Sequence, residues 1–290
     1  MNIWKITRDK LSHYFCKGKP PISPASPGFI EPHTYLLSPL PNNNRYLYKI
    51  TNIDYLLSSI LGNYLYFNNV SSYNDFQLAD INDGAQPPLE RPINASSSFE
   101  TDPKYTMENY YDNSRSRTYA SCFSIQNSEH IWENYGNHNP TAKVGIIFDY
   151  TKLKTMLNAV MLSSNTRLLT NHIPCIQFFS INYGMIKYVN WQQAKNESEF
   201  LRNPIEHAYI KDLAFQEENE FRITLSALGL GNFTLNNGEV LDFTQRPSLH
   251  LYFNYLAAAA NGTIIGIQYS YNGKIENFQN LISDFRIFPT

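Results

Sequence analysis

Short runs of aromatic and β-branched residues recur along this chain, and stretches with helical periodicity separate only some of them. Such runs are typical of strands. The predicted strands are 46–51, 64–70, 119–125, 144–149, 218–225 and 263–269. Residues 176–179 and 185–189 are predicted to form a hairpin or two separate strands around Asn182-Tyr183-Gly184. Because helices do not alternate regularly with these strands, the pattern favours an α+β fold over a doubly wound sheet.

The remaining segments divide the chain into regions. The predicted helices are 53–61, 128–135, 151–162, 197–213, 249–261 and 274–283. An amphipathic helix is expected in 1–17, followed by a Pro-rich linker in 18–44, because proline interrupts both helices and central strands. The domain proper is expected to span 45–290. Within it, 81–117 has little periodicity and is predicted to be a loop insertion that acts as a mobile flap.

Composition and charge exclude several classes of protein. Aromatic residues make up 14% of the chain, too many for a disordered protein, and the net charge of −2 comes without a basic stripe for a nucleic-acid backbone. Cys16, Cys122 and Cys175 are widely spaced, so neither a disulfide framework nor a metal site is expected. With no signal peptide and no membrane-spanning stretch recognised, we expect a cytoplasmic protein, or one delivered into a target cell's cytoplasm without a signal peptide.

The segment 216–225 carries the strongest chemical signal. If 218–225 is a strand, Glu218, Glu220 and Arg222 share one face with Thr224, while the other face is mostly apolar. Neighbouring carboxylates raise one another's pKa and a nearby arginine lowers it, which suits acid–base chemistry or stabilisation of a cationic transition state. The alternative is a solvated edge strand with alternating charges.

Two further groups of residues suit ligand binding. Tyr48 and Lys49 lie on the first predicted strand, where they could stack on and hydrogen-bond a nucleotide-like ligand. Ser124 ends a later strand close to a predicted helix N-terminus, and Trp132 and Tyr135 lie on that helix. The alternative is an ordinary helix cap with the aromatic residues in the core. P-loop, dinucleotide-binding and zinc-protease motifs are absent from the sequence.

In this order the motifs resemble a bacterial family of uncharacterised domains, whose pattern runs L-Y-K-Y, S-F-N-D, F-S, W-x-x-Y, G-x-x-F-D and E-x-E-x-R. The corresponding residues here are Leu47-Tyr48-Lys49-Ile50, Ser72-Tyr73-Asn74-Asp75, Phe123-Ser124, Trp132 with Tyr135, Gly145 with Phe148-Asp149, and Glu218, Glu220 and Arg222. The same layout is similar to the ADP-ribosyltransferase fold. That resemblance implies a split antiparallel mixed sheet with flanking helices, which holds NAD in a central cleft.

The resemblance also implies roles for individual residues. Tyr48 and Lys49 would contact NAD, and Ser124 would orient its ribose. Glu220 would hold the ribose 2′-hydroxyl and stabilise an oxocarbenium-like transition state, while Glu218 would face the acceptor nucleophile. Trp132, Tyr135 and Arg222 complete the expected cofactor-binding set.

The sequence hypothesis is therefore an NAD-consuming ADP-ribosyltransferase or NAD glycohydrolase that acts as a bacterial toxin or defence effector. Its expected partners are NAD, a macromolecular acceptor (protein or nucleic acid) and a regulator bound at the N-terminal helix. One alternative is a non-catalytic nucleotide- or protein-binding module of the same fold. A third is a nuclease or other hydrolase that uses the carboxylates with a divalent metal.

Overall fold

The computed structural model describes residues 37–75, 80–99, 102–136, 143–162, 179–196, 202–227, 233–234, 240–241, 246–271 and 274–277. Its centre is a nine-stranded sheet with strand order β13-β2-β5-β1-β6-β14-β15, to which β10 and β7 are added beside β5. Every pairing within this sheet is antiparallel. The strands are β1 (Tyr46–Asn52), β2 (Tyr64–Asn69), β5 (Thr118–Ser124), β6 (Lys143–Asp149), β7 (Ser180–Met185), β10 (Glu220–Ser226), β13 (Ser248–Tyr252), β14 (Ile264–Tyr271) and β15 (Lys274–Asn277). The predicted α+β class, with a large antiparallel sheet and flanking helices, is confirmed.

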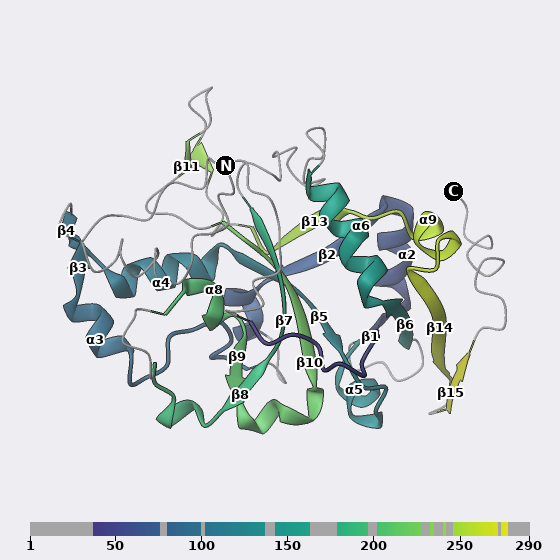
Figure 1. Cartoon of the computed structure of the whole chain (residues 1–290), viewed down its shortest axis with the longest axis horizontal. Coiled ribbons are helices and arrows are strands. Elements are labelled where there is room, and N and C mark those ends of the chain that lie inside the picture. Colours follow the sequence, from purple (N-terminus) through teal and green to yellow (C-terminus); the bar gives the residue numbers. More distant parts are fainter. Residues whose placement is uncertain are drawn as a thin grey trace.

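The sheet forks at β5. One edge of β5 pairs with β10 along its whole length, from Thr118 opposite Ser226 to Ser124 opposite Glu220. The other edge pairs with β2 at Tyr119 and Ala120, and with β1 only at Ser124. The β2–β13 branch and the β1–β6–β14–β15 branch therefore diverge from one shared strand (Figure 1).

Three helices cover one face of the sheet. They are α2 (Ile53–Gly62), α6 (Tyr150–Leu162) and α9 (Tyr255–Ala260), which Figure 1 shows grouped beside β6 and β14. Their buried side chains join strand residues such as Phe148 and Phe221 in the main apolar core. The ends of α2 follow from its sequence, because Asn52 accepts a hydrogen bond from the Asp54 N–H and Asn63 adopts the left-handed conformation that ends a helix.

The segment predicted to be a loop consists largely of helix and strand, so that prediction is wrong. Residues 81–117 include α3 (Arg91–Ser96), β3 (Ser98–Phe99), β4 (Asp102–Thr106) and α4 (Met107–Ser116). The inward side of α4 consists of Met107, Tyr110, Tyr111 and Ser114. Because tyrosine and serine supply most of this buried side, the helix lacks the aliphatic periodicity that would have revealed it.

Four other expectations need correction. The predicted helix 249–261 is β13 followed by α9, because its first part alternates Leu249 and Leu251 inward in strand fashion. The predicted helix 274–283 begins as β15, and its remainder lies outside the described residues. The expected turn at Asn182-Tyr183-Gly184 lies inside β7, and 176–178 is not described.

The predicted helix 197–213 is also replaced. Its described part contains only α8 (Pro204–His207), followed by β9 (Ile210–Asp212), which pairs in parallel with β8 (Lys187–Val189). Short elements complete the described structure: η1 (Val70–Asp75), η2 (Trp191–Gln193), η3 (Leu213–Glu218), α5 (Glu129–Asn134), β11 (Phe233–Thr234) and β12 (Val240–Leu241).

The predicted N-terminal helix 1–17 and most of the linker lie outside the described residues. The described end of the Pro-rich stretch contacts the domain, since Leu37 is buried and Ser38 bridges to Met185. Among the helices that the structure describes, none has the length and apolar composition that a bilayer crossing requires.

Candidate functional site

The charged face of β10 is buried at the centre of the fold. Along 220–225 the predicted alternation is confirmed, because Phe221, Ile223 and Leu225 enter the main core while Glu220 and Arg222 lie on the other face. The edge-strand alternative is wrong, since β10 pairs with β5 on one side and β7 on the other. The guanidinium-bearing side chain of Arg222 is 0% exposed.

Glu218 reaches this face by a different route from the one predicted. It ends the 3₁₀ helix η3, and the strand begins only at Glu220. Asn219 between them has φ 45°, a left-handed conformation that asparagine tolerates better than most residues. This turn, and not strand alternation, brings the two glutamates to the same site.

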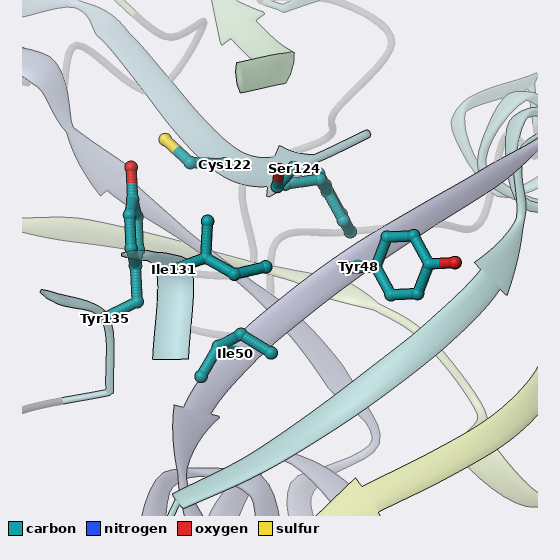
Figure 2. Close-up of a pocket in the computed structure, with 7 residues that line it drawn as sticks. Tyr48, Ile50, Cys122, Ser124, Ile131 and Tyr135 are labelled. Carbon is teal, nitrogen blue, oxygen red and sulfur yellow. The ribbon is translucent and has the colours of Figure 1, made fainter. Parts of the chain in front are cut away.

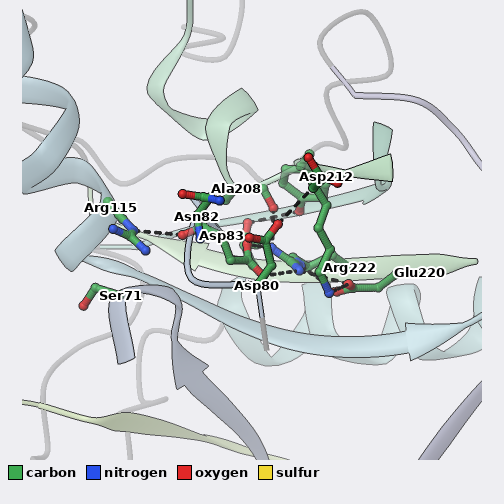
Figure 3. A network of polar contacts seen from close by, with 12 residues as sticks. Ser71, Asp80, Asn82, Asp83, Arg115, Ala208, Asp212, Glu220 and Arg222 are labelled. Atoms are coloured by element: carbon green, nitrogen blue, oxygen red, sulfur yellow. Dashed lines mark hydrogen bonds and ion pairs between the residues drawn. The ribbon is translucent and has the colours of Figure 1, made fainter. Parts of the chain in front are cut away.

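Arg222 is the centre of a buried ionic network (Figure 3). Its Nη1 and Nη2 donate to the two carboxylate oxygens of Asp83 at 2.6 and 2.8 Å. Its Nε and Nη2 donate to Glu220 at 2.7 and 3.0 Å, and Nη1 also donates to the Ala208 carbonyl at 2.7 Å. Arg222 therefore connects β10 to the segment before α3 and to the turn after α8.

Lys211 links the two glutamates. Its ammonium donates to Glu218 at 2.5 Å and to Glu220 at 3.3 Å, and it lies 4.8 Å from the centre of the Phe215 ring. The lysine is placed by β9, whose last residue, Asp212, accepts hydrogen bonds from the N–H groups of Trp191 and Ala214. We call Asp83, Lys211, Glu218, Glu220 and Arg222 the carboxylate cluster.

The environment separates the pKa values of the two glutamates. Burial raises the pKa of Glu218 to about 7, despite the opposing charge of Lys211. Glu220 is also buried, but Arg222 and Lys211 outweigh that effect and lower its pKa to about 2. At neutral pH, Glu220 is thus a fixed anion while Glu218 exchanges a proton, which is the division expected of an acid–base pair.

A small hollow opens beside the cluster, between β1, β5 and α5 (Figure 2). Its lining residues are Tyr48, Ile50, Cys122, Phe123, Ser124, Ile131 and Tyr135. Its volume is about 10 Å³, roughly the room that one water molecule needs. The Tyr135 hydroxyl hydrogen-bonds Glu218, and the Cys122 thiol lies against Glu220, so the hollow borders both carboxylates.

The structure brings most of the predicted site residues together. Tyr48, Ser124 and Tyr135 line the hollow, and the Ser124 hydroxyl donates to the Glu218 carbonyl at 2.8 Å. Lys49 extends from the opposite face of β1, where it donates to Ser121 at 2.9 Å at the sheet fork. Trp132 is buried with Ile50 and Ile131, and its indole N–H donates to Asn127 at 2.7 Å.

Sequence reasoning missed three members of the site. Asp83 lies in the stretch taken for a loop, and Lys211 in a stretch taken for a helix, so neither could be placed beside Glu220. The third is Tyr188, whose hydroxyl accepts a hydrogen bond from the Glu220 N–H at 2.9 Å.

The carboxylate cluster does not resemble a metal site. Both oxygens of Asp83 are occupied by Arg222, and no group of three or more potential metal ligands occurs in the described part of the chain.

The raised pKa of Glu218 predicts a specific pH dependence of stability. Because the folded state binds this proton more tightly than the unfolded state, its contribution is fully present below about pH 4.5 and is lost as pH rises through about 7. Between pH 5 and 8 the free energy of unfolding should therefore fall more steeply in the wild type than in Glu218→Gln, by at most about 3 kcal/mol. Urea denaturation across this range measures the difference, and parallel curves for the two proteins would contradict it.

The function of the cluster has to be inferred from its own geometry. No protein-family model, no curated protein and no solved structure matches this chain.

Proposed function

We propose that the chain is an NAD-consuming enzyme, either an ADP-ribosyltransferase or an NAD glycohydrolase, that acts as a bacterial toxin or defence effector. The observation that supports this most is the pair of glutamates with divergent pKa values beside one hollow. Glycosyl transfer uses such a pair, with one ionised carboxylate near the developing positive charge and one carboxyl group that exchanges a proton.

The two glutamates have different roles in this proposal. Cleavage breaks the bond between ribose C1′ and the nicotinamide nitrogen, and the bonding electrons leave with nicotinamide. Glu220, ionised well below neutral pH, stabilises the resulting positive charge on the ribose. Glu218, half ionised near pH 7, takes the proton of the water or macromolecular acceptor as its oxygen or nitrogen attacks C1′.

Substrate access requires movement of side chains. The hollow has room for one water molecule, and Glu218 is only 7% exposed. Tyr135 and Tyr188, which contact Glu218 and Glu220, must therefore turn aside before a dinucleotide can reach the carboxylates. Lids that close over reacting groups are common in enzymes, because they exclude water.

The closed network also favours a second candidate function. Arg222 and Lys211 already occupy the oxygens of Glu220, as expected of a structural ionic cluster in a non-catalytic binding module. In that case Glu218 and Glu220 would hold η3, β9 and β10 together and would not meet a substrate.

Nicotinamide release from NAD by the purified chain separates the two functions. We expect release by the wild type and a loss of about 10²- to 10⁴-fold in Glu218→Gln and Glu220→Gln. The matched control is Glu217→Gln, one residue away, whose side chain is 74% exposed and which should keep full activity. Dependence of release on added cell lysate would identify a transferase, and release without it a glycohydrolase.

The folded state of each variant is checked by circular dichroism, because Glu220 is buried and its replacement disturbs Arg222. A folded wild type that releases no nicotinamide with or without lysate would reject the enzyme and favour the binding module. Undiminished release by a folded Glu218→Gln variant would reject the role of Glu218.

A further inference from the structure

A polar cleft lies on the far side of the β8–β9 ribbon from the carboxylate cluster. Tyr188 and Lys211 point from this ribbon toward Glu220 and Glu218. Their neighbours Lys187, Val189 and Ile210 instead line the cleft, as expected where successive strand residues face opposite sides. The ribbon is thus a single layer that separates two polar regions, and Figure 1 shows it beside β10 below α8.

The cleft has the size of a small-molecule site. Its volume is about 620 Å³, within the range of roughly 300–1,000 Å³ that ligand pockets occupy. Most of its lining is polar, and the polar side chains include Lys187, Asn190, Gln193, Lys195, Arg202 and Glu206. A purely apolar ligand would displace water from Asn190, Gln193 and the two lysines without replacing its hydrogen bonds, so the cleft suits a hydrogen-bonding ligand.

The charges of the cleft are only partly compensated. Arg202 is bound by Glu90 at 2.7 Å and by Glu206 at 3.6 Å, so its positive charge is already paired. Lys187 and Lys195, which are both exposed, form no salt bridge with any carboxylate in the described parts of the chain. Two ammonium groups on one concave polar surface attract an anion.

We propose that this cleft binds a phosphate-bearing small molecule, with the phosphate held by Lys187 and Lys195 and the organic part against Asn190 and Gln193. Lysine ammonium groups bind phosphate through charge-assisted hydrogen bonds. The volume greatly exceeds what a bare phosphate fills, which leaves room for a nucleoside-sized group. The site is separate from the hollow at Glu218, and its occupation does not depend on NAD cleavage.

Isothermal titration of the full chain with adenosine 5′-monophosphate and with inorganic pyrophosphate tests this site. We expect both probes to bind the wild type and the Lys187→Gln/Lys195→Gln double variant to bind them about tenfold more weakly or worse. The matched control is Lys152→Gln, which removes an exposed lysine on α6 whose ammonium donates to the Asn261 carbonyl. It should bind like the wild type.

The outcomes are distinct. The site is supported if either probe binds the wild type and Lys152→Gln equally well but binds the double variant more weakly. Binding of neither probe to the folded wild type overturns it, as does equal weakening in Lys152→Gln, which would reveal diffuse charge attraction. Both probes are also fragments of NAD and could bind at the hollow beside Glu218, so binding is assigned to this cleft only where the double variant, which leaves that hollow unchanged, weakens it.

Discussion

Replacing Arg222 by methionine should lower the free energy of unfolding by about 3–5 kcal/mol, a large share of the roughly 5–15 kcal/mol that is typical of a folded domain. The side chain is fully buried and forms paired hydrogen bonds with both Asp83 and Glu220. Methionine fills a similar volume but leaves two carboxylates buried without their main cation. The cost comes from those stranded charges, because a buried ion pair as a whole adds little net stability.

Urea denaturation of three variants tests this explanation. Arg91→Met is the matched control, since Arg91 is 43% exposed and pairs with Glu108 and Asp112 at the surface, where a salt bridge contributes about 1 kcal/mol or less. Adding Asp83→Asn to Arg222→Met removes one stranded charge and should recover part of the loss. Equal losses in Arg222→Met and Arg91→Met would show that the buried network has no special energetic role.

Acidification from pH 5 to pH 2 should remove about 3 kcal/mol of stability through Glu90 alone. Burial by itself would raise the pKa of Glu90, but Arg202, which donates to it at 2.7 Å, and the His207 imidazole 3.5 Å away lower it to about 2. A carboxylate with a lowered folded-state pKa stabilises the protein above its unfolded value of about 4.5, and this contribution is lost as pH falls toward 2. Glu220, also lowered to about 2, acts in the same direction.

The Glu90→Gln variant isolates the contribution of this residue. Its stability at pH 7 should be lower, because Arg202 loses an ionic partner at 2.7 Å, but its further loss below pH 5 should be smaller than in the wild type. Thermal unfolding monitored at pH 7, 5, 4, 3 and 2 provides the comparison. If both proteins lose the same stability on acidification, the protons that destabilise the fold bind to carboxylates other than Glu90.

The parts of the fold that followed from the sequence are those governed by local alternation. In β10, Phe221 and Ile223 face the core and Arg222 faces away, as the period of two requires. The helix after β1 also begins at the predicted residue, Ile53, and Asn52 caps it, although it runs one residue past the predicted end and includes Gly62. In these segments, local preference and tertiary packing favour the same conformation.

The parts that did not follow depend on distant contacts. Asp83 pairs with Arg222, which lies 139 positions further along the chain. No residue near Asp83 in the sequence indicates this pairing, because it forms only when the two distant segments fold together. Similarly, Leu249 and Leu251 are buried because β13 pairs with β2, although the alanines that follow resemble a helix from the sequence alone. The E-x-E spacing predicts that Glu218 and Glu220 lie close together because they alternate along one strand. They do lie close together, but because Asn219 between them adopts a left-handed conformation.

The sharing of β5 between the branches of the sheet has a consequence for the nascent chain. Strand β5 ends at Ser124, but its full-length partner β10 is complete only at Ser226. While the ribosome synthesises the intervening residues, one edge of β5 lacks its native partner. Exposed strand edges can pair with other chains, so β5 is open to such pairing until β10 emerges.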